Sequence, residues 1–313
     1  MQTCPMCKNE KTFLVNAQPE DFEYAVIAND TFKICRCDDC RSEFLFPRPT
    51  VEQLVSFYPA DYHAYNDDHG FVAGTLVSMR EKKRAAAYIK LFPKAPVRIF
   101  DVGCGDCRHF DSIRKFGDFE FGGVELNSRM AEAGRKRGYQ VECGTLEEMN
   151  IVDHESKYDI VTMYHLVEHV LEPPVLLEKA FKLLKPGGMV VGQLPCRDSL
   201  EKSIFGRFWA GYHYPRHMQM LSKYGLNKLL SSVGFGEIEV KTALHLQAGI
   251  SLQNFITGGI GYNPKKKFGK IPIYSLLLLM VAPYCIFEFL CGKGGIMNFR
   301  AFKPKLNDNG GQA

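Results

Sequence analysis

The sequence has little net charge and no segment typical of an exported protein. Its formal net charge is +4 over 313 residues, which is too small to indicate a nucleic-acid or acidic-polymer partner by itself. The amino terminus begins Met1-Gln2-Thr3-Cys4-Pro5 and shows no basic region, apolar core or small-residue cleavage site of a secretory signal. We therefore expect a cytoplasmic protein, and we expect no nucleic-acid partner.

The cysteine pattern also does not indicate a disulfide framework. The 11 cysteines, in a chain without an export signal, are better explained by metal-bound thiolates and scattered buried thiols. Four of them form two Cys-x-x-Cys pairs, and each pair can present two thiolates from a tight turn to one tetrahedral zinc ion. We predict a structural zinc ribbon over residues 1–48, with the ligands Cys4, Cys7, Cys37 and Cys40.

A redox-active pair and a different choice of metal ligand are the two other interpretations of these cysteines. No βαβ pattern surrounds either pair, which speaks against a redox-active Cys-x-x-Cys. The stretch Phe22–Ile34 alternates enough to form a hairpin that brings the pairs together, while Cys35 is a spare thiol that can compete with Cys37 for the metal. Four cysteine ligands leave no open coordination position, so the predicted zinc supports folding and not catalysis.

The rest of the chain alternates between strand-like and helix-like segments. Pro47-Arg48-Pro49 marks a linker, and residues 49–95 are predicted to be a linker with a helical cap, helix-like from Leu76 to Phe92. Residues 96–313 are predicted to form a doubly wound α/β sheet. The expected strands are Val97–Val102, Glu120–Glu125, Tyr139–Glu142, Tyr158–Met163, Met189–Gln193, Glu237–Thr242 and Ile296–Phe302.

A glycine turn follows the first of these strands, in Asp101-Val102-Gly103-Cys104-Gly105-Asp106. Glycines there let the backbone approach a ligand closely, and open α/β sheets bind nucleotides in the crevice at the strand ends. The second strand ends in Glu125, whose carboxylate can accept hydrogen bonds from two ribose hydroxyls. A dinucleotide site needs a third glycine beside the pyrophosphate, but Arg108 occupies that position. The turn therefore does not need to hold a pyrophosphate, and it only needs to accommodate a cofactor with a compact amino-acid tail.

Together these features resemble the class I S-adenosylmethionine-dependent methyltransferases. Asp101–Gly105 resembles the first motif of that family, and Glu125 resembles its ribose-binding acid. Tyr158–Val161 is similar to the family's fourth strand, and Leu184–Gly188 to the turn before its fifth.

The resemblance covers residues 97–235 and implies a seven-stranded, Rossmann-like methyltransferase fold with S-adenosylmethionine as cofactor. By the family's pattern, Gly103 and Gly105 contact the methionine part, Glu125 the ribose, and the segment Cys143–Leu146 the adenine. The cofactor-binding residues implied in this way are Asp101, Gly103, Gly105, Glu125, Leu126, Thr145 and Leu146.

Cys107 departs from the family's pattern, because many members have a third glycine there, and this leaves the local shape of the turn open. The cysteine pairs followed by Phe57-Tyr58-Pro59 and Tyr62 also resemble a subgroup in which such a ribbon precedes the methyltransferase domain. Some members of that subgroup methylate sugar nucleotides or other small metabolites.

Methyl transfer from a sulfonium requires an aligned nucleophile, and a base if the acceptor is a hydroxyl or an acidic carbon. The segment His165-Leu166-Val167-Glu168-His169 follows the fourth predicted strand directly. We expect His165 or His169 to act as the base, with Glu168 orienting it. The same segment spells the His-x-x-Glu-His motif of zinc-dependent hydrolases, but a strand precedes it and Pro173-Pro174 follows closely. A zinc hydrolase and a non-catalytic binding protein remain the two alternatives.

An aromatic and basic cluster lies between the fifth strand and the next helix, in residues 208–217. Its composition suits a flat or anionic acceptor, with Arg216 pairing a phosphate or carboxylate and aromatic rings packing against a ring or sugar. The alternative is a packed loop. The predicted substrate-binding residues are Tyr62, Trp209, Tyr212, His213, Arg216 and His217.

An apolar segment, Ile271–Cys291, lies within a predicted insertion at about residues 244–293. It is long enough to raise the question of a membrane span, but the sixth and seventh strands that flank it must lie in one sheet, so the segment must return to its starting side. Lys265-Lys266-Lys267 before it suits an anionic lipid surface. We expect peripheral contact at the inner face of a membrane, or a lid over the active site. The acceptor is then a small molecule, with a sugar or a lipid-linked metabolite as candidates.

Overall fold

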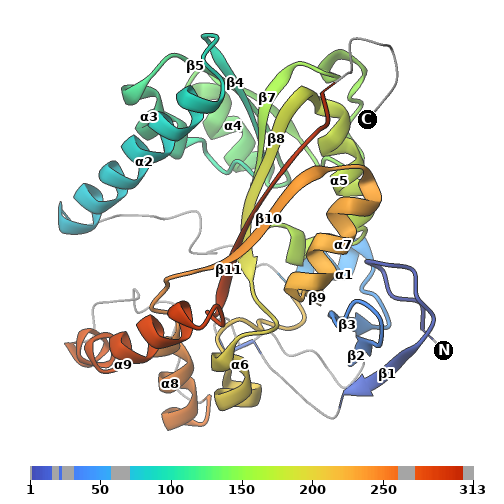
Figure 1. Cartoon of the computed structure of the whole chain (residues 1–313), viewed down its shortest axis with the longest axis vertical. Coiled ribbons are helices and arrows are strands. Elements are labelled where there is room, and N and C mark those ends of the chain that lie inside the picture. The colour runs from blue at the N-terminus through green and yellow to red at the C-terminus, as the bar shows by residue number, and fades with distance from the viewer. Residues whose placement is uncertain (1, 16–20, 23–31, 58–70, 260–271, 306–313) are drawn as a thin grey trace.

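A computed structural model describes residues 2–15, 21–22, 32–57, 71–259 and 272–305. Within these residues the chain forms one seven-stranded sheet flanked by helices and one small four-stranded sheet (Figure 1). The central part of the expected Phe22–Ile34 hairpin and Tyr62 lie outside the described residues.

The large sheet has the strand order β10-β11-β8-β7-β4-β5-β6. The pairs among β4 to β8 are parallel, while β11 runs antiparallel to both β8 and β10. The doubly wound, seven-stranded fold predicted from the sequence is therefore confirmed. Its strands are β4 Val97–Val102, β5 Phe119–Glu125, β6 Gln140–Cys143, β7 Tyr158–Tyr164, β8 Leu184–Pro195, β10 Gly236–Ala243 and β11 Ile296–Phe302.

The strand order reverses beside β4. From β4 the chain continues outward to β5 and β6 and then crosses back to place β7 and β8 on the other side. The carboxyl ends of β4, β5 and β7 therefore surround a topological switch point, which is where open α/β sheets bind their ligands.

Helices cover both faces of this sheet because its central strands are apolar on both sides. In β4, Ile99 belongs to a buried cluster with Tyr88 of helix α2, whereas its neighbour Phe100 belongs to a cluster with Leu177 of α5 and Leu229 of α7. The flanking helices are α2 Phe71–Leu91, α3 Arg108–Ile113, α4 Ser128–Lys136, α5 Pro173–Leu183 and α7 Lys223–Val233. The shorter helical segments are α1 Val51–Ser56, η2 Arg114–Phe116, η3 Val152–His154, η4 Val167–His169, α6 Leu200–Phe205 and η5 Gly206–Phe208.

Local sequence accounts for where several of these helices begin and end. The Asn127 side chain accepts hydrogen bonds from the first backbone N–H groups of α4, at 3.0 and 3.2 Å, as an N-cap residue does. Pro173 and Pro174 open α5, where no N–H partner is needed. Ser222 caps α7, and Gly234 ends it in the left-handed conformation with φ 104°.

The small sheet joins the amino-terminal region to the middle of the chain. Its strands β1 (Thr12–Val15), β2 (Lys33–Cys37) and β3 (Glu43–Phe46) are consecutive, but its fourth strand is β9 (Gln219–Met220), which pairs antiparallel with β3. The amino-terminal strands therefore lie beside α1 and β9 in Figure 1.

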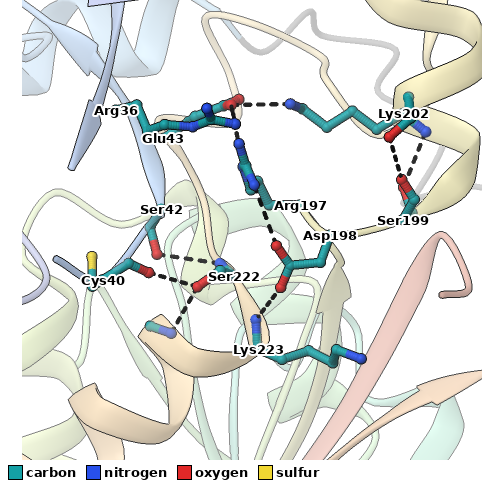
Figure 2. A network of polar contacts seen from close by, with 12 residues as sticks. Arg36, Cys40, Ser42, Glu43, Arg197, Asp198, Ser199, Lys202, Ser222 and Lys223 are labelled. Atoms are coloured by element: carbon teal, nitrogen blue, oxygen red, sulfur yellow. Dashed lines mark hydrogen bonds and ion pairs between the residues drawn. The ribbon is translucent and has the colours of Figure 1, made fainter. Parts of the chain in front are cut away.

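A polar network fastens this small sheet to the rest of the molecule (Figure 2). Oε1 of Glu43, a buried residue of β3, lies 3.2 Å from Arg197 Nε, 3.0 Å from Lys202 Nζ and 3.6 Å from Arg36 Nη2. Ser222 Oγ donates to the backbone oxygen of Cys40 at 2.6 Å. Because carboxylate and cations come from different parts of the sequence, this contact depends on the tertiary fold.

The predicted insertion begins and ends at the same sheet edge, since Ala243 at the end of β10 pairs with Ile296 at the start of β11. The two ends of the apolar insertion therefore lie next to each other, as the expected pairing of the sixth and seventh strands requires. The insertion contains α8 (Ala248–Thr257) and α9 (Pro272–Leu290), which pack against each other away from the sheet (Figure 1). Among the described helices, α9 included, none combines the length and apolar character needed to cross a bilayer.

Candidate active site

The glycine turn and the acid at the end of β5 meet at the switch point. Gly105 N donates to Glu125 Oε2 at 2.9 Å, and Asn127 N donates to Glu125 Oε1 at 2.8 Å. Gly103 and Gly105 have φ values of 78° and 56°, which favour glycine. Burial raises the pKa of the Glu125 carboxyl. The turn and the carboxylate thus form one continuous rim, as the sequence pattern predicts.

Cys107 supplies the turn shape that the sequence left open. Its φ is 63°, the left-handed conformation that glycine adopts most easily, and it is the residue from which α3 starts. The Cys107 side chain is fully buried. A Cβ atom at Gly134 of α4 would lie 2.9 Å from the Cys107 sulfur, so close packing against α4 maintains the turn.

Asp101 lies beneath the turn, at the end of β4. Its carboxylate accepts a hydrogen bond from Thr162 Oγ1 of β7 and lies 2.9 Å from His109 Nε2 of α3. Asp101 therefore links the two strands that flank the crevice.

The remaining predicted cofactor residues differ in exposure. Leu126 follows the acid and has an exposed side chain, whereas Leu146 is completely buried in the main core. Thr145 Oγ accepts a hydrogen bond from Glu148 N at 3.3 Å. Gly144 N donates to the Glu125 backbone oxygen at 3.0 Å, which holds this segment next to β5.

His165 lies at the end of β7 with a left-handed backbone, φ 52°. Its Nδ1 is 3.4 Å from Glu168 Oε1, and its Nε2 is 3.1 Å from Gln193 Oε1. Partial desolvation opposes protonation of the ring, but Glu168 and Gln193 outweigh it, so the pKa of His165 is raised. The side chain remains 48% exposed. His165 is therefore the most accessible acid–base group on this strand.

Glu168 and His169 are close to His217, a residue predicted for the substrate and not for catalysis. One ligand-type atom from each of the three lies within 4.8 Å of the others. Burial lowers the pKa of His169 to about 4 and lowers that of His217 well below its usual value. Both rings are thus neutral near pH 7. His165 does not belong to this group, so the paired histidine ligands that the His-x-x-Glu-His hydrolases require do not form here.

The aromatic and basic segment is largely buried. Trp209 and Tyr212 pack in a core cluster with β9, and Arg216, 1% exposed, forms an ion pair with Asp21 in which Nη2 and Oδ1 are 3.1 Å apart. His213 Nδ1 is 3.3 Å from the same Asp21 oxygen. Burial opposes ionisation of Asp21, but His213 and Arg216 hold its pKa well below the usual range. The Arg216 charge is therefore matched within the protein.

The four predicted zinc ligands gather in one place. Sγ of Cys4 is 3.6 Å from Sγ of Cys40, and Sγ of Cys7 is 3.5 Å from Sγ of Cys37, with all four sulfur atoms within 4.8 Å of one another. Thiolates around one tetrahedral zinc, each about 2.3 Å from the metal, lie about 3.8 Å apart. The donor set and spacing are compatible with zinc.

Sequence patterns missed several groups around the crevice. The Arg84 guanidinium of α2 lies 4.7 Å from the centre of the ring of Tyr164, the residue before His165. Tyr88 of the same helix is buried close to both Arg84 and Tyr164. Asp21, the partner of Arg216, was also missed. No motif marks these residues, because only tertiary packing brings α2 to Tyr164 and Asp21 to Arg216.

A doubly wound sheet with a glycine turn and a carboxylate at its switch point defines the class of α/β proteins that bind nucleoside cofactors. Within that class, residues 77–240, more than half of the 313 residues, match the family described as methyltransferase domain. The chain belongs to this methyltransferase family.

Named relatives share only part of their length with this chain. The ubiquinone biosynthesis O-methyltransferase of Maricaulis maris is 27% identical over 179 residues, which are 55% of this chain and 65% of that protein. The enzyme of the same name from Hydrogenovibrio crunogenus is 33% identical over 97 residues, or 29% of this chain and 40% of that protein. The matches therefore span less than two thirds of these relatives. A solved methyltransferase from Archaeoglobus fulgidus is 20% identical, with 72% of this chain and 94% of that chain covered and a TM-score of 0.47.

Proposed function

We propose that this protein is an S-adenosylmethionine-dependent methyltransferase that acts on an oxygen or carbon of a small molecule. The observation that carries the proposal is the rim formed by Gly105 and Glu125 at the switch point, in a chain of the methyltransferase family. A buried carboxylate fixed by two backbone N–H groups is positioned to accept ribose hydroxyls. Gly103 and Gly105 leave room for the methionine part, and Leu126, Thr145 and Leu146 border the adenine.

We assign the proton-accepting role to His165, with Glu168 orienting it. The ring of His165 is accessible, lies at the carboxyl end of β7 and contacts Glu168 Oε1 at 3.4 Å. Against the effect of burial, Glu168 and Gln193 raise the pKa of the His165 ring, which strengthens it as a proton acceptor. His169 has its pKa lowered to about 4 by burial, so it is the weaker base of the two candidates.

We also propose that the four clustered cysteines hold a structural zinc ion. They form a closed set of four thiol ligands with none left for a substrate. Three of the four are buried, and they share a core cluster with Phe44 and Leu226. A metal in this place stabilises the small sheet and the helix packed on it.

The insertion supports a further part of the proposal, contact with an anionic lipid surface. Val281 and Cys285 of α9 face inward, while Leu279, Phe287 and Leu290 are strongly exposed. Ile256 of α8, the helix that packs against α9, is strongly exposed as well, and grouped exposed apolar residues are typical of a membrane or protein contact. The basic residues 265–267 that favour lipid are outside the described residues. Cosedimentation with phosphatidylglycerol vesicles, weakened by Phe287→Ser, supports lipid contact, whereas equal pelleting of both proteins refutes it.

The cofactor assignment is tested by calorimetry with S-adenosylhomocysteine, the demethylated product. We expect saturable binding at one site per chain. Purified protein incubated with cell extract and methyl-labelled S-adenosylmethionine then identifies the acceptor as the labelled small molecule. If the folded protein binds neither S-adenosylhomocysteine nor S-adenosylmethionine, the proposed function is refuted.

A further inference from the structure

Three metal-ligand side chains, well separated in sequence from the amino-terminal cysteines, meet where η4 lies against the segment before β9. Glu168 and His169 come from η4, and His217 comes from the segment before β9. A carboxylate oxygen and one nitrogen of each ring lie within 4.8 Å of one another. Ligands of one metal ion are this close because each of them lies about 2 Å from the metal.

The backbone fixes which nitrogen of each histidine carries the proton. His169 Nδ1 lies 3.1 Å from the Arg216 backbone oxygen, and His217 Nδ1 lies 2.8 Å from the Gly211 backbone oxygen. A carbonyl oxygen only accepts hydrogen bonds, so each Nδ1 is the donor and the lone pair is on Nε2. Metal-binding histidines are oriented in this way by a carbonyl or carboxylate behind the ring.

The carboxylate of Glu168 lacks the partners that a buried charge needs. Glu168 is 1% exposed, and neither of its oxygens has a hydrogen-bond partner among the described residues. The His165 ring approaches one of them, Oε1, at 3.4 Å, but that ring is half exposed and leaves Oε2 uncompensated. Burying a carboxylate without full compensation is costly, and a cation between Glu168 and the two neutral imidazoles would remove that cost.

Hydrogen bonds hold the segment that carries Glu168 and His169, and its neighbour Leu166 contacts the glycine turn. Gln219 Nε2 donates to the backbone oxygens of Val167 and Val170, at 2.5 and 2.8 Å, which fixes η4. Leu166 packs on the glycine turn, since its Cδ1 would lie 3.3 Å from a Cβ atom at Gly103.

We propose that Glu168, His169 and His217 bind a divalent transition-metal ion, separate from any metal held by the four cysteines. One carboxylate and two imidazoles are a common ligand set for zinc and similar ions, and three protein ligands leave a coordination position open. If the proposed methyl transfer is correct, the open position suits an acceptor with an oxygen ligand. The presence of the metal does not depend on that function.

Metal stoichiometry tests the site directly. Protein produced with zinc and dialysed is expected to hold two zinc ions per chain by elemental analysis. Glu168→Gln keeps the size of the side chain and removes its charge, and His217→Gln removes one nitrogen ligand, so each variant should hold one. His154→Gln, at a partly buried histidine outside the cluster, is the matched control and should keep two.

Cobalt substitution separates the two sites by their ligands. Thiolate-to-cobalt absorption in the near ultraviolet reports the cysteine cluster, and it should be unchanged in Glu168→Gln, which also shows that this variant is folded. One zinc ion in the wild type, or two in both ligand variants, would overturn the proposal. Binding of S-adenosylhomocysteine by the wild type tests the proposed function separately, because a protein with one zinc can still bind it.

Discussion

Glu125 supports the glycine turn and is proposed to hold the ribose. Its two oxygens accept hydrogen bonds from Gly105 N and Asn127 N, so its removal leaves backbone donors as well as ribose hydroxyls without an acceptor. Glu125→Ala should weaken S-adenosylhomocysteine binding by about 1–3 kcal/mol, measured by calorimetry. Glu120→Ala, at an exposed glutamate of the same strand, is the control, and equal affinities of the two variants would contradict the assignment of Glu125.

We expect Glu201 of α6 to make the stability of the protein depend on pH. Burial raises the pKa of its carboxyl from 4.5 to about 8, and Ser251 of α8 donates a hydrogen bond to it. Between these two pH values the folded protein holds a proton that the unfolded chain has released. The free energy of unfolding should therefore fall by about 1.4 kcal/mol per pH unit as pH rises from 4.5 towards about 8.

Glu201→Gln tests this dependence, because glutamine keeps the size of the side chain and cannot ionise. Urea unfolding at about pH 6 and about pH 8 should show a smaller loss of stability in the variant than in the wild type. Glu178→Gln, at an exposed position of α5, should behave like the wild type. A loss of the same size in Glu201→Gln would show that other groups cause the dependence.

Residue-level prediction from the sequence succeeded where a motif is contiguous. The turn Asp101–Gly105 and the acid Glu125 were predicted next to each other and are joined by a hydrogen bond. For Arg216 the sequence predicted an anionic substrate partner, but the structure pairs its charge with Asp21. A residue nearly two hundred positions away cannot be identified as a partner from one sequence, because charge pairing depends on the fold.

At the scale of elements, α7 packs directly on the second cysteine pair. A Cβ atom at Gly225 would lie 2.2 Å from Ser42 Oγ and 2.9 Å from the Cys40 backbone oxygen, so only glycine fits there. Gly225→Ala should destabilise the protein by about 1–3 kcal/mol through overpacking, although alanine favours helices. Ser231→Ala, exposed on the same helix, is the control in urea unfolding, and a Gly225→Ala protein as stable as that control would refute the close contact.

Strands were predicted more accurately than the connections between sheets. Alternating apolar patterns placed β4 and β11 at their observed bounds. The two-residue strand β9 was not predicted, because so short a segment carries no periodic pattern, yet it joins the small sheet to the rest of the chain.

At the scale of the whole molecule, the cysteine cluster and the large sheet share one core. Cys4, Cys37 and Cys40 belong to the same buried cluster as Phe100 of β4 and Leu229 of α7. Loss of a zinc ion from these ligands should therefore destabilise the entire protein, with a fall in Tm of roughly 10 °C or more. Scanning calorimetry with and without a strong chelator measures this, and added zinc should restore the original Tm. A methyltransferase domain that melts at an unchanged temperature after metal removal would show that the two parts are independent.

The sequence by itself determined the seven-stranded sheet, the glycine turn with its acid and the four clustered cysteines. Each of these depends on residues that are close in sequence or on a period of apolar side chains, and such signals are local. Only the tertiary structure decided that Glu168 and His169 meet His217, that Asp21 neutralises Arg216, and that β9 completes the small sheet. These contacts join segments separated by about fifty to two hundred residues. The packing of helices and loops on the sheet brings the segments together, and no short sequence pattern encodes that packing.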